Sequence, residues 1–223
     1  MDDESLSYAK QHKLDFWEML GKDSPVNQRQ KAIFMAGTPG AGKTEVAEEF
    51  AKLGTGLVRL DADWFRQYFP GYTGQNAADF QRGSAWLVDW CFTRLIKKHY
   101  SFILDGTFAF SRATMNIQRA LDHDYDTTIY FVSQDPVVAW DFTKARAIKA
   151  GRVVPKERFI NAYDKSQTNV AEAKRLFGDK IELSLILKNY QDDIEDIVED
   201  VENIDLILPT LFSKTELEAR LND

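Results

Sequence analysis

Residues 37–44 constrain this chain more than any other segment. They read Gly-Thr-Pro-Gly-Ala-Gly-Lys-Thr and match the pattern G-x-x-x-x-G-K-[ST]. The apolar residues 33–35 before them read as a buried strand, and the segment after them predicts a helix. One face of that helix carries Val46, Ala47, Phe50 and Leu53. A strand, a glycine-rich loop and a helix in this order indicate a phosphate-binding loop, or P-loop.

The residues of this loop have separate tasks in binding a nucleoside triphosphate. Glycines let backbone N–H groups turn toward phosphate oxygens. Lys43 is expected to reach the outer phosphates, and the Thr44 hydroxyl to bind Mg²⁺. We therefore expect ATP or GTP, together with Mg²⁺, as cofactors. The residues expected to bind the nucleotide are Gly37, Thr38, Pro39, Gly40, Ala41, Gly42, Lys43 and Thr44.

Composition limits the number of domains, the partners and the cellular location that we expect for this chain. With 223 residues, of which 44% are hydrophobic, the chain can form a single α/β domain. A net charge of -7 argues against nucleic acid or an anionic membrane as partner. The one cysteine, Cys91, cannot form an internal disulfide, and no apolar run reaches the roughly 18 residues of a membrane span. The acidic first residues lack the basic start of a signal peptide, so we expect a cytoplasmic protein.

Strand-like and helix-like segments alternate along the chain. After the P-loop, strands are expected at 57–60, 101–107, 127–132 and 181–187, with a long helix at about 76–99. This alternation predicts an α/β fold with a mostly parallel sheet flanked by helices on both faces, of the P-loop NTPase or nucleotide-kinase type. In such a fold the ligand site lies beyond the carboxyl ends of the strands.

The pattern divides the chain into two regions. Residues 1–30 are expected to form an N-terminal helical arm, with a helix at about 6–20 and a polar link through Ser24 and Pro25. Residues 31–223 are expected to form the P-loop kinase domain, with a lid-like segment at about 141–160. Within it, the acidic stretch 191–202 has helical spacing of apolar residues and reads as a solvated amphipathic helix. Residues 213–216 have the spacing of a capping box before a final helix.

Acidic residues follow two of the expected strands. Asp61 and Asp63 come at the end of the second strand, and Asp105 and Thr107 at the end of the third. A carboxylate at this edge can accept the proton of an attacking hydroxyl, which is the role we expect for Asp63. Asp61, Asp63 or Asp105 could instead hold Mg²⁺ through water. Asp63 could also act as the N-cap of a helix beginning at Trp64, and the two roles can coexist.

A basic segment interrupts this acidic chain. Residues 144–158 hold six basic side chains and one acidic side chain, including Arg146 and Arg152. Arginines on a closing segment can neutralise the charge of a transferring phosphoryl group, Gly151 offers a hinge, and Pro155 can begin the next helix. Two alternatives remain open at this point, a solvated helix face and an RNA-binding patch.

The motifs of rival P-loop classes are missing. No Asn-Lys-x-Asp motif follows a strand, and the third strand ends in a single acid rather than an Asp-Glu pair. These features favour a small-molecule kinase. The alternatives are a nucleotide-dependent switch or binding protein, and a kinase that acts on RNA or another nucleotide.

Taken together, residues 31–177 resemble the zeta toxin family of P-loop kinases, which are toxins of bacterial toxin–antitoxin systems. The resemblance rests on the P-loop, on Asp-Ala-Asp-Trp-Phe-Arg-Gln-Tyr-Phe-Pro at 61–70, on Asp-Gly-Thr at 105–107, and on Arg146 with Arg-Val-Val-Pro at 152–155. It implies that Asp63 is the catalytic base, that Lys43 binds phosphate, and that Arg146 and Arg152 clasp the phosphates.

The resemblance also implies an acceptor and a partner. Members of the family phosphorylate a nucleotide sugar, UDP-N-acetylglucosamine, and related enzymes use other nucleotide sugars or NAD. A separate antitoxin protein is implied as partner. The residues assigned to the acceptor are Asp61, Asp89, Asp105 and Thr107.

Overall fold

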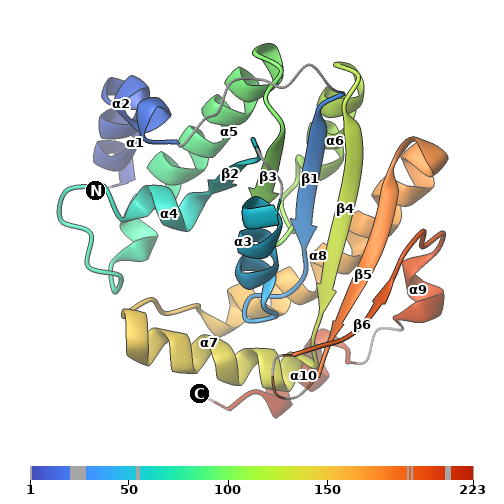
Figure 1. The fold of residues 1–223 in the computed structure, drawn as a ribbon. Coiled ribbons are helices and arrows are strands. Elements are labelled where there is room, and N and C mark those ends of the chain that lie inside the picture. Colours follow the sequence, from blue (N-terminus) through green and yellow to red (C-terminus); the bar gives the residue numbers. More distant parts are fainter. Residues whose placement is uncertain are drawn as a thin grey trace.

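The strands of this protein lie in a single sheet. The computed structural model describes residues 2–20, 29–53, 56–189, 191, 193–208 and 212–222. Within these residues six strands pair in the order β2-β3-β1-β4-β5-β6 (Figure 1). Their bounds are β1 Lys31–Ala36, β2 Val58–Asp61, β3 Phe102–Asp105, β4 Asp126–Ser133, β5 Glu182–Lys188 and β6 Ile194–Val198. The first five are mutually parallel and β6 runs antiparallel to β5.

Helices cover both faces of this sheet. The alternation of side chains along β1 directs Phe34 to one face and Met35 to the other. On the Met35 face packs α3, Lys43–Leu53, and on the Phe34 face pack α5, Gln81–Lys97, α6, Ala113–Leu121, and α8, Lys156–Phe177. Figure 1 shows α3 in front of the sheet and α8 behind it. The predicted α/β architecture is confirmed.

The predicted strands are confirmed, but the acidic segment is not a helix. Residues 191–202 have the i, i+3, i+4 spacing of an amphipathic helix, yet β6 pairs there with β5, with Ile197 opposite Ile186 and Asp196 opposite Leu187. The apolar residues of the segment are β-branched and suit an extended backbone. Pairing with the edge of β5 also satisfies backbone groups that a helix in solution would have to satisfy alone. The prediction of a helix here is wrong.

The N-terminal arm consists of two helices, α1, Asp2–Gln11, and α2, Lys13–Met19, where a single helix at 6–20 was expected. Its side chains Phe16, Trp17 and Leu20 are buried in the same core cluster as Phe34 of the sheet. Helix α1 lies against α5, where a Cβ added to Gly83 would lie 2.6 Å from the carbonyl oxygen of Ser5. The expected link through residues 24 and 25 falls outside the described residues.

The lid-like segment has a small core of its own. Helix α7, Pro136–Ala150, ends at Gly151, whose φ of 71° gives the left-handed cap that favours glycine. Helix α8 follows, and α10, Lys214–Arg220, packs against it. Trp140, Phe159 and Leu217 are buried together at this junction. The predicted capping box is present, because Ser213 and Glu216 bond each other's backbone N–H groups.

The remaining elements are short: α4 Ala62–Arg66, the 3₁₀ helices η1 Ala77–Phe80 and η2 Gly178–Lys180, and α9 Ile204–Ile207. Among the helices in the described part of the chain, none combines the length and the apolar character needed to cross a bilayer.

Candidate active site

The P-loop connects β1 to the N-terminus of α3. Gly37, Gly40 and Gly42 have φ values of 128°, 79° and 84°, which other residues rarely adopt. The N–H of Gly37 donates to Ser166 Oγ at 2.7 Å and to the carbonyl oxygen of Thr107 at 3.3 Å. These contacts fix the start of the loop against α8 and against the segment that follows β3.

Lys43 begins α3 and is almost enclosed, with 8% of its surface exposed. Its ammonium donates to the carbonyl oxygen of Thr38 at 2.5 Å. Burial lowers the pKa of Lys43 to about 8, while the charge of Asp105 acts in the opposite direction. An incoming anion would therefore stabilise the charged form of Lys43.

At the end of β2, Asp61 and Asp63 have different bonding partners. Asp61 is the N-cap of α4, because its Oδ1 accepts the backbone N–H of Asp63 at 2.8 Å. The cap is thus Asp61, and the alternative in which Asp63 caps a helix beginning at Trp64 is wrong. The carboxylate of Asp63 is left to other partners.

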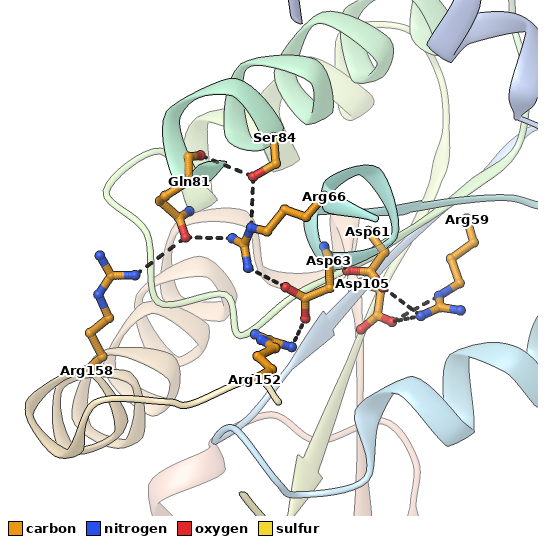
Figure 2. Close-up of polar contacts among 9 residues, drawn as sticks. All are labelled: Arg59, Asp61, Asp63, Arg66, Gln81, Ser84, Asp105, Arg152 and Arg158. Carbon is orange, nitrogen blue, oxygen red and sulfur yellow. Dashed lines mark hydrogen bonds and ion pairs between the residues drawn. The ribbon is translucent and has the colours of Figure 1, made fainter. Parts of the chain in front are cut away.

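Two arginines hold the Asp63 carboxylate (Figure 2). Arg66, one turn further along α4, donates from one terminal nitrogen to Asp63 Oδ1 at 2.6 Å. Arg152, from the loop between α7 and α8, pairs with Asp63 Oδ2. Burial lowers the pKa of Arg152, and the negative charge of Asp61 opposes this effect. An ion pair therefore joins the loop between α7 and α8 to the first turn of α4.

A second cluster joins the ends of β2 and β3. Asp61 and Asp105 are opposite each other in the sheet register, and Arg59 donates to both carboxylates at 2.9 to 3.0 Å. Arg59 also reaches Glu48 of α3 at 3.0 Å. Burial raises the pKa of Asp61 and of Asp105, and Arg59 opposes that rise at both groups. Arg59 thus favours the ionised state of two neighbouring carboxylates.

Most of these groups, but not Arg59 or Glu48, line one cleft of about 780 Å³ at the carboxyl end of the sheet. Lys43, Asp63 and Arg152 all face it, and so does Arg146 of α7. The other sequence-predicted residues among its lining are Pro39, Gly40, Gly42, Thr44, Asp61, Asp105 and Thr107.

Four predicted residues do not line the cleft: Gly37, Thr38 and Ala41 are still part of the P-loop, whereas Asp89 lies elsewhere. Asp89 is in the middle of α5, its side chain is half exposed, and it pairs with Arg119 of α6 at 3.3 Å. It is not among the residues that line the cleft. The geometry gives no support to a role for Asp89 in acceptor binding.

Sequence reasoning missed three basic side chains at this site, Arg59, Arg66 and Lys149. Arg66 stands three residues after Asp63, and Lys149 stands three residues after Arg146, so both share a helix face with a predicted residue. That spacing could have found them. Arg59 stands two residues before Asp61 on β2, so these two also share a face, but its link to Asp105 depends on the pairing of β2 with β3.

The sheet order, the P-loop and the cleft together define a P-loop protein of the nucleotide-kinase type. The comparison with family models is more specific, because the zeta toxin model matches residues 18–198. The chain belongs to the zeta toxin family. No curated protein sequence matches it.

Solved structures with the same fold include a protein of a toxin–antitoxin system and the AvrRxo1-ORF1:-ORF2 complex. One comes from the PezAT chromosomal toxin–antitoxin system of the human pathogen Streptococcus pneumoniae. It is 18% identical, has a TM-score of 0.66, and the match covers 96% of this chain and 94% of that one. The native AvrRxo1-ORF1:-ORF2 complex is 16% identical with a TM-score of 0.65, over 100% of this chain and 79% of that one. The same complex with ATP is 15% identical with a TM-score of 0.63, over 100% and 80%.

Proposed function

We propose that this protein is a kinase that transfers the γ-phosphoryl group of ATP or GTP to a hydroxyl of a nucleotide sugar, UDP-N-acetylglucosamine or a related metabolite. The observation that carries the proposal is the meeting of Lys43, Asp63 and Arg152 in one cleft at the end of the sheet. A phosphate-binding cation, a carboxylate and a lid arginine are the groups that phosphoryl transfer uses. Membership of the zeta toxin family supports the same reaction class.

The residues present fit a magnesium-bound triphosphate. A Cβ added to Gly37 would lie 2.3 Å from the carbonyl oxygen of Val132, and one added to Gly40 would lie 2.1 Å from that of Ala139. The loop therefore needs glycine at both positions, as a phosphate cradle does. Thr44 is the residue that would hold Mg²⁺, and Asp61 and Asp105, which line the same cleft, would act on it through water. When bound, Mg²⁺ supplies positive charge to the β- and γ-phosphate oxygens.

In the proposed reaction the side chains of the chain have distinct roles. Lys43 and the P-loop N–H groups bind the triphosphate. Asp63 accepts the proton of the acceptor hydroxyl, whose oxygen forms a bond to the γ-phosphorus as the bond to the β,γ-bridging oxygen breaks. Arg146 and Arg152 neutralise the charge of the transferring group and exclude water. The nucleoside diphosphate carries away the electron pair of the broken bond.

The Asp63–Arg152 pair implies an order of events. In the present arrangement Arg152 occupies one oxygen of the carboxylate that would receive the proton. A triphosphate offers that guanidinium a stronger anionic partner, since phosphate oxygens accept charge-assisted bonds readily. Donor binding would then draw Arg152 toward the γ-phosphate and free Asp63 for the acceptor.

The proposal also assigns the residues that contact the acceptor and a biological role as a toxin. Asp61, Asp105 and Thr107 line the cleft beside Asp63 and are the residues we assign to acceptor contacts. By its family the protein would be a toxin that a separate antitoxin protein controls. Expression of the wild type without a partner should then arrest growth, and expression of Lys43→Ala should not. Equal growth of the two strains would refute the toxin role while leaving the kinase activity open to test.

Mass analysis of products tests the kinase directly. We expect incubation with ATP or GTP, Mg²⁺ and a panel of nucleotide sugars to yield a metabolite heavier by one phosphoryl group. Asp63→Asn should bind ATP as the wild type does but lose about 10²- to 10⁴-fold in transfer, because it removes the general base. A nucleotide-dependent switch would consume ATP without forming a new phosphoester. Full activity of Asp63→Asn would refute the assignment of the base.

The lid arginine provides a second test. Arg152→Ala should lower turnover by about 10³- to 10⁵-fold, the range known for arginines that stabilise transferring phosphoryl charge. The unfolding free energy should change by only about 1 kcal/mol, since the Arg152–Asp63 pair is partly exposed. Single-turnover rates and urea denaturation measure the two effects. Arg175→Ala, at the far end of α8, is the control, and an unchanged rate in Arg152→Ala would remove the lid mechanism.

A further inference from the structure

Arg66 is the most enclosed arginine of the network in Figure 2, with 5% of its surface exposed. Each of its three nitrogens has a separate partner. Nε donates to Ser84 Oγ at 3.1 Å, one terminal nitrogen donates to Asp63 Oδ1 at 2.6 Å, and the other donates to Gln81 Oε1 at 2.6 Å. The guanidinium thus spans the gap between α4, which carries Asp63, and the first turn of α5.

The two partners on α5 are themselves fixed. Ser84 is completely buried, and its hydroxyl donates to the carbonyl oxygen of Gln81 at 3.2 Å. Gln81 Oε1 accepts a second, longer bond from Arg158 of α8 at 3.5 Å. The serine and the glutamine therefore set the plane of the Arg66 guanidinium.

This arrangement argues against two simpler roles for Arg66. Arg66 lines the cleft, but only 5% of its surface is exposed and each of its three nitrogens already donates to a protein group, so little of the guanidinium is open to a substrate phosphate. An ion pair that merely ties α4 to α5 would not need the carboxylate, since Ser84 and Gln81 already make that link. What the Asp63 bond adds is the orientation of the carboxylate, with Oδ1 held by α4 and Oδ2 directed to Arg152 in the cleft.

We propose that Arg66 is a positioning residue of the phosphoryl-transfer reaction. Held by Ser84 and Gln81, it fixes the Asp63 carboxylate so that Oδ2 faces the acceptor hydroxyl. The inference rests on the proposed role of Asp63 as the base. Arg66 itself touches neither substrate nor the transferring group.

A double-mutant cycle separates this role from a structural one. Arg66→Met should lower kcat by about 10²-fold, the cost of misplacing a reacting group by about 1 Å, with little change in the KM for ATP. In the Asp63→Asn background the same substitution should change kcat less than about twofold, because the group it positions is gone. A loss that is equal in both backgrounds would show that Arg66 only supports the fold, and would overturn the proposal.

Milder variants keep the test usable if Arg66→Met does not fold. Gln81→Met and Ser84→Ala each remove one bond to the guanidinium and should lower kcat by about tenfold, again only when Asp63 is present. Arg94→Met is the matched control: it removes a guanidinium of α5, which lies over the rings of Trp17 and Trp90 at 5.1 and 5.2 Å from the ring centroids. It should lower stability and leave kcat unchanged.

The rate in every variant is the transfer of ³²P from γ-labelled ATP to the panel acceptor that the wild type phosphorylates best. If none is phosphorylated, the rate of ATP hydrolysis takes its place, with water as acceptor. Loss of rate in Asp63→Asn combined with an unchanged rate in the Arg66, Gln81 and Ser84 variants would overturn the positioning role alone. An unchanged rate in Asp63→Asn would overturn the proposed base, and the positioning role with it.

Discussion

At the scale of single residues, Lys43 shows how the site is prepared for an anion. Its ammonium is buried beside the P-loop, and its pKa of about 8 lies below the ordinary value of 10.5 because of that burial. Between these two values the unfolded chain binds more protons than the folded chain. The contribution of Lys43 to the unfolding free energy therefore rises with pH across this window. At lower pH, where the ammonium is charged, an anionic ligand would offset the cost of burying that charge.

The depressed pKa of Lys43 predicts a pH dependence of ATP binding. Above about pH 8 the free protein loses the Lys43 proton, and the triphosphate must restore it, so the Kd for ATP should rise by up to about tenfold per pH unit. Calorimetric titrations from about pH 7 to about pH 9.5 measure this slope. Lys43→Arg keeps its charge throughout and should show no slope above pH 8. A flat Kd in the wild type would contradict the depressed pKa.

At the scale of elements, the P-loop and α7 are packed backbone to backbone. Gly40 has a φ of 79°, and a Cβ there would meet the carbonyl oxygen of Ala139 at 2.1 Å and Thr143 Cγ2 at 2.9 Å. Helix α7 carries Arg146 and leads into the loop with Arg152. The P-loop, which would bind the donor, therefore also contacts the helix that carries Arg146. A shift of either one would move the other.

Gly40→Ala should break this coupling. The left-handed backbone costs an alanine about 1–2 kcal/mol, and the contact with Ala139 adds about 1–3 kcal/mol because α7 must move. We expect this loss in urea denaturation together with an ATP affinity at least about tenfold lower. Gly71→Ala is the matched control, since its φ is 78° but nothing lies within 4 Å of the added Cβ. Equal effects in the two variants would show that strain alone acts at Gly40.

At the scale of the whole molecule, the two helices α1 and α2 contribute to the main core. Trp17 of α2 is 4% exposed. Its ring packs edge-on against those of Trp90 and Tyr100, with ring centroids 6.3 and 6.2 Å apart. Helix α1 covers α5, the helix that also carries Ser84 and Gln81. The arm therefore packs against α5, the helix whose side chains hold Arg66 and, through it, Asp63.

Trp17→Ala tests this integration. Removing a buried tryptophan should cost about 3–5 kcal/mol of unfolding free energy, while the fraction that remains folded should bind ATP as the wild type does. Denaturation followed by circular dichroism and calorimetric titration measure the two properties. Leu14→Ala, an exposed position on the same helix, should change stability little. A small loss in Trp17→Ala would mean that the arm is peripheral to the core.

The sequence determined the fold class and most of the strand positions, because buried parallel strands and the P-loop leave signals that are local in the chain. Spacing alone predicts Lys43 and Thr44, and positions at strand ends predict Asp61, Asp63 and Asp105; all five line the same cleft, while their roles stay predictions. The acidic segment was misread, because Ile194, Ile197 and Val198 fit both a helical face and an edge strand. Only the pairing with the free edge of β5, which ends at Lys188 shortly before β6 begins, decided between them.

What only the tertiary structure decided is the pairing of charges. Arg59 meets Asp105 across two strands, Arg152 reaches Asp63 from the other side of the cleft, and Arg66 is fixed by two side chains of α5. Asp89 was assigned to the site through a family resemblance, but α5 places it beside Arg119. A charge pair depends on distances between segments that the chain order does not specify, whereas a loop that turns around a phosphate is encoded within a few consecutive residues.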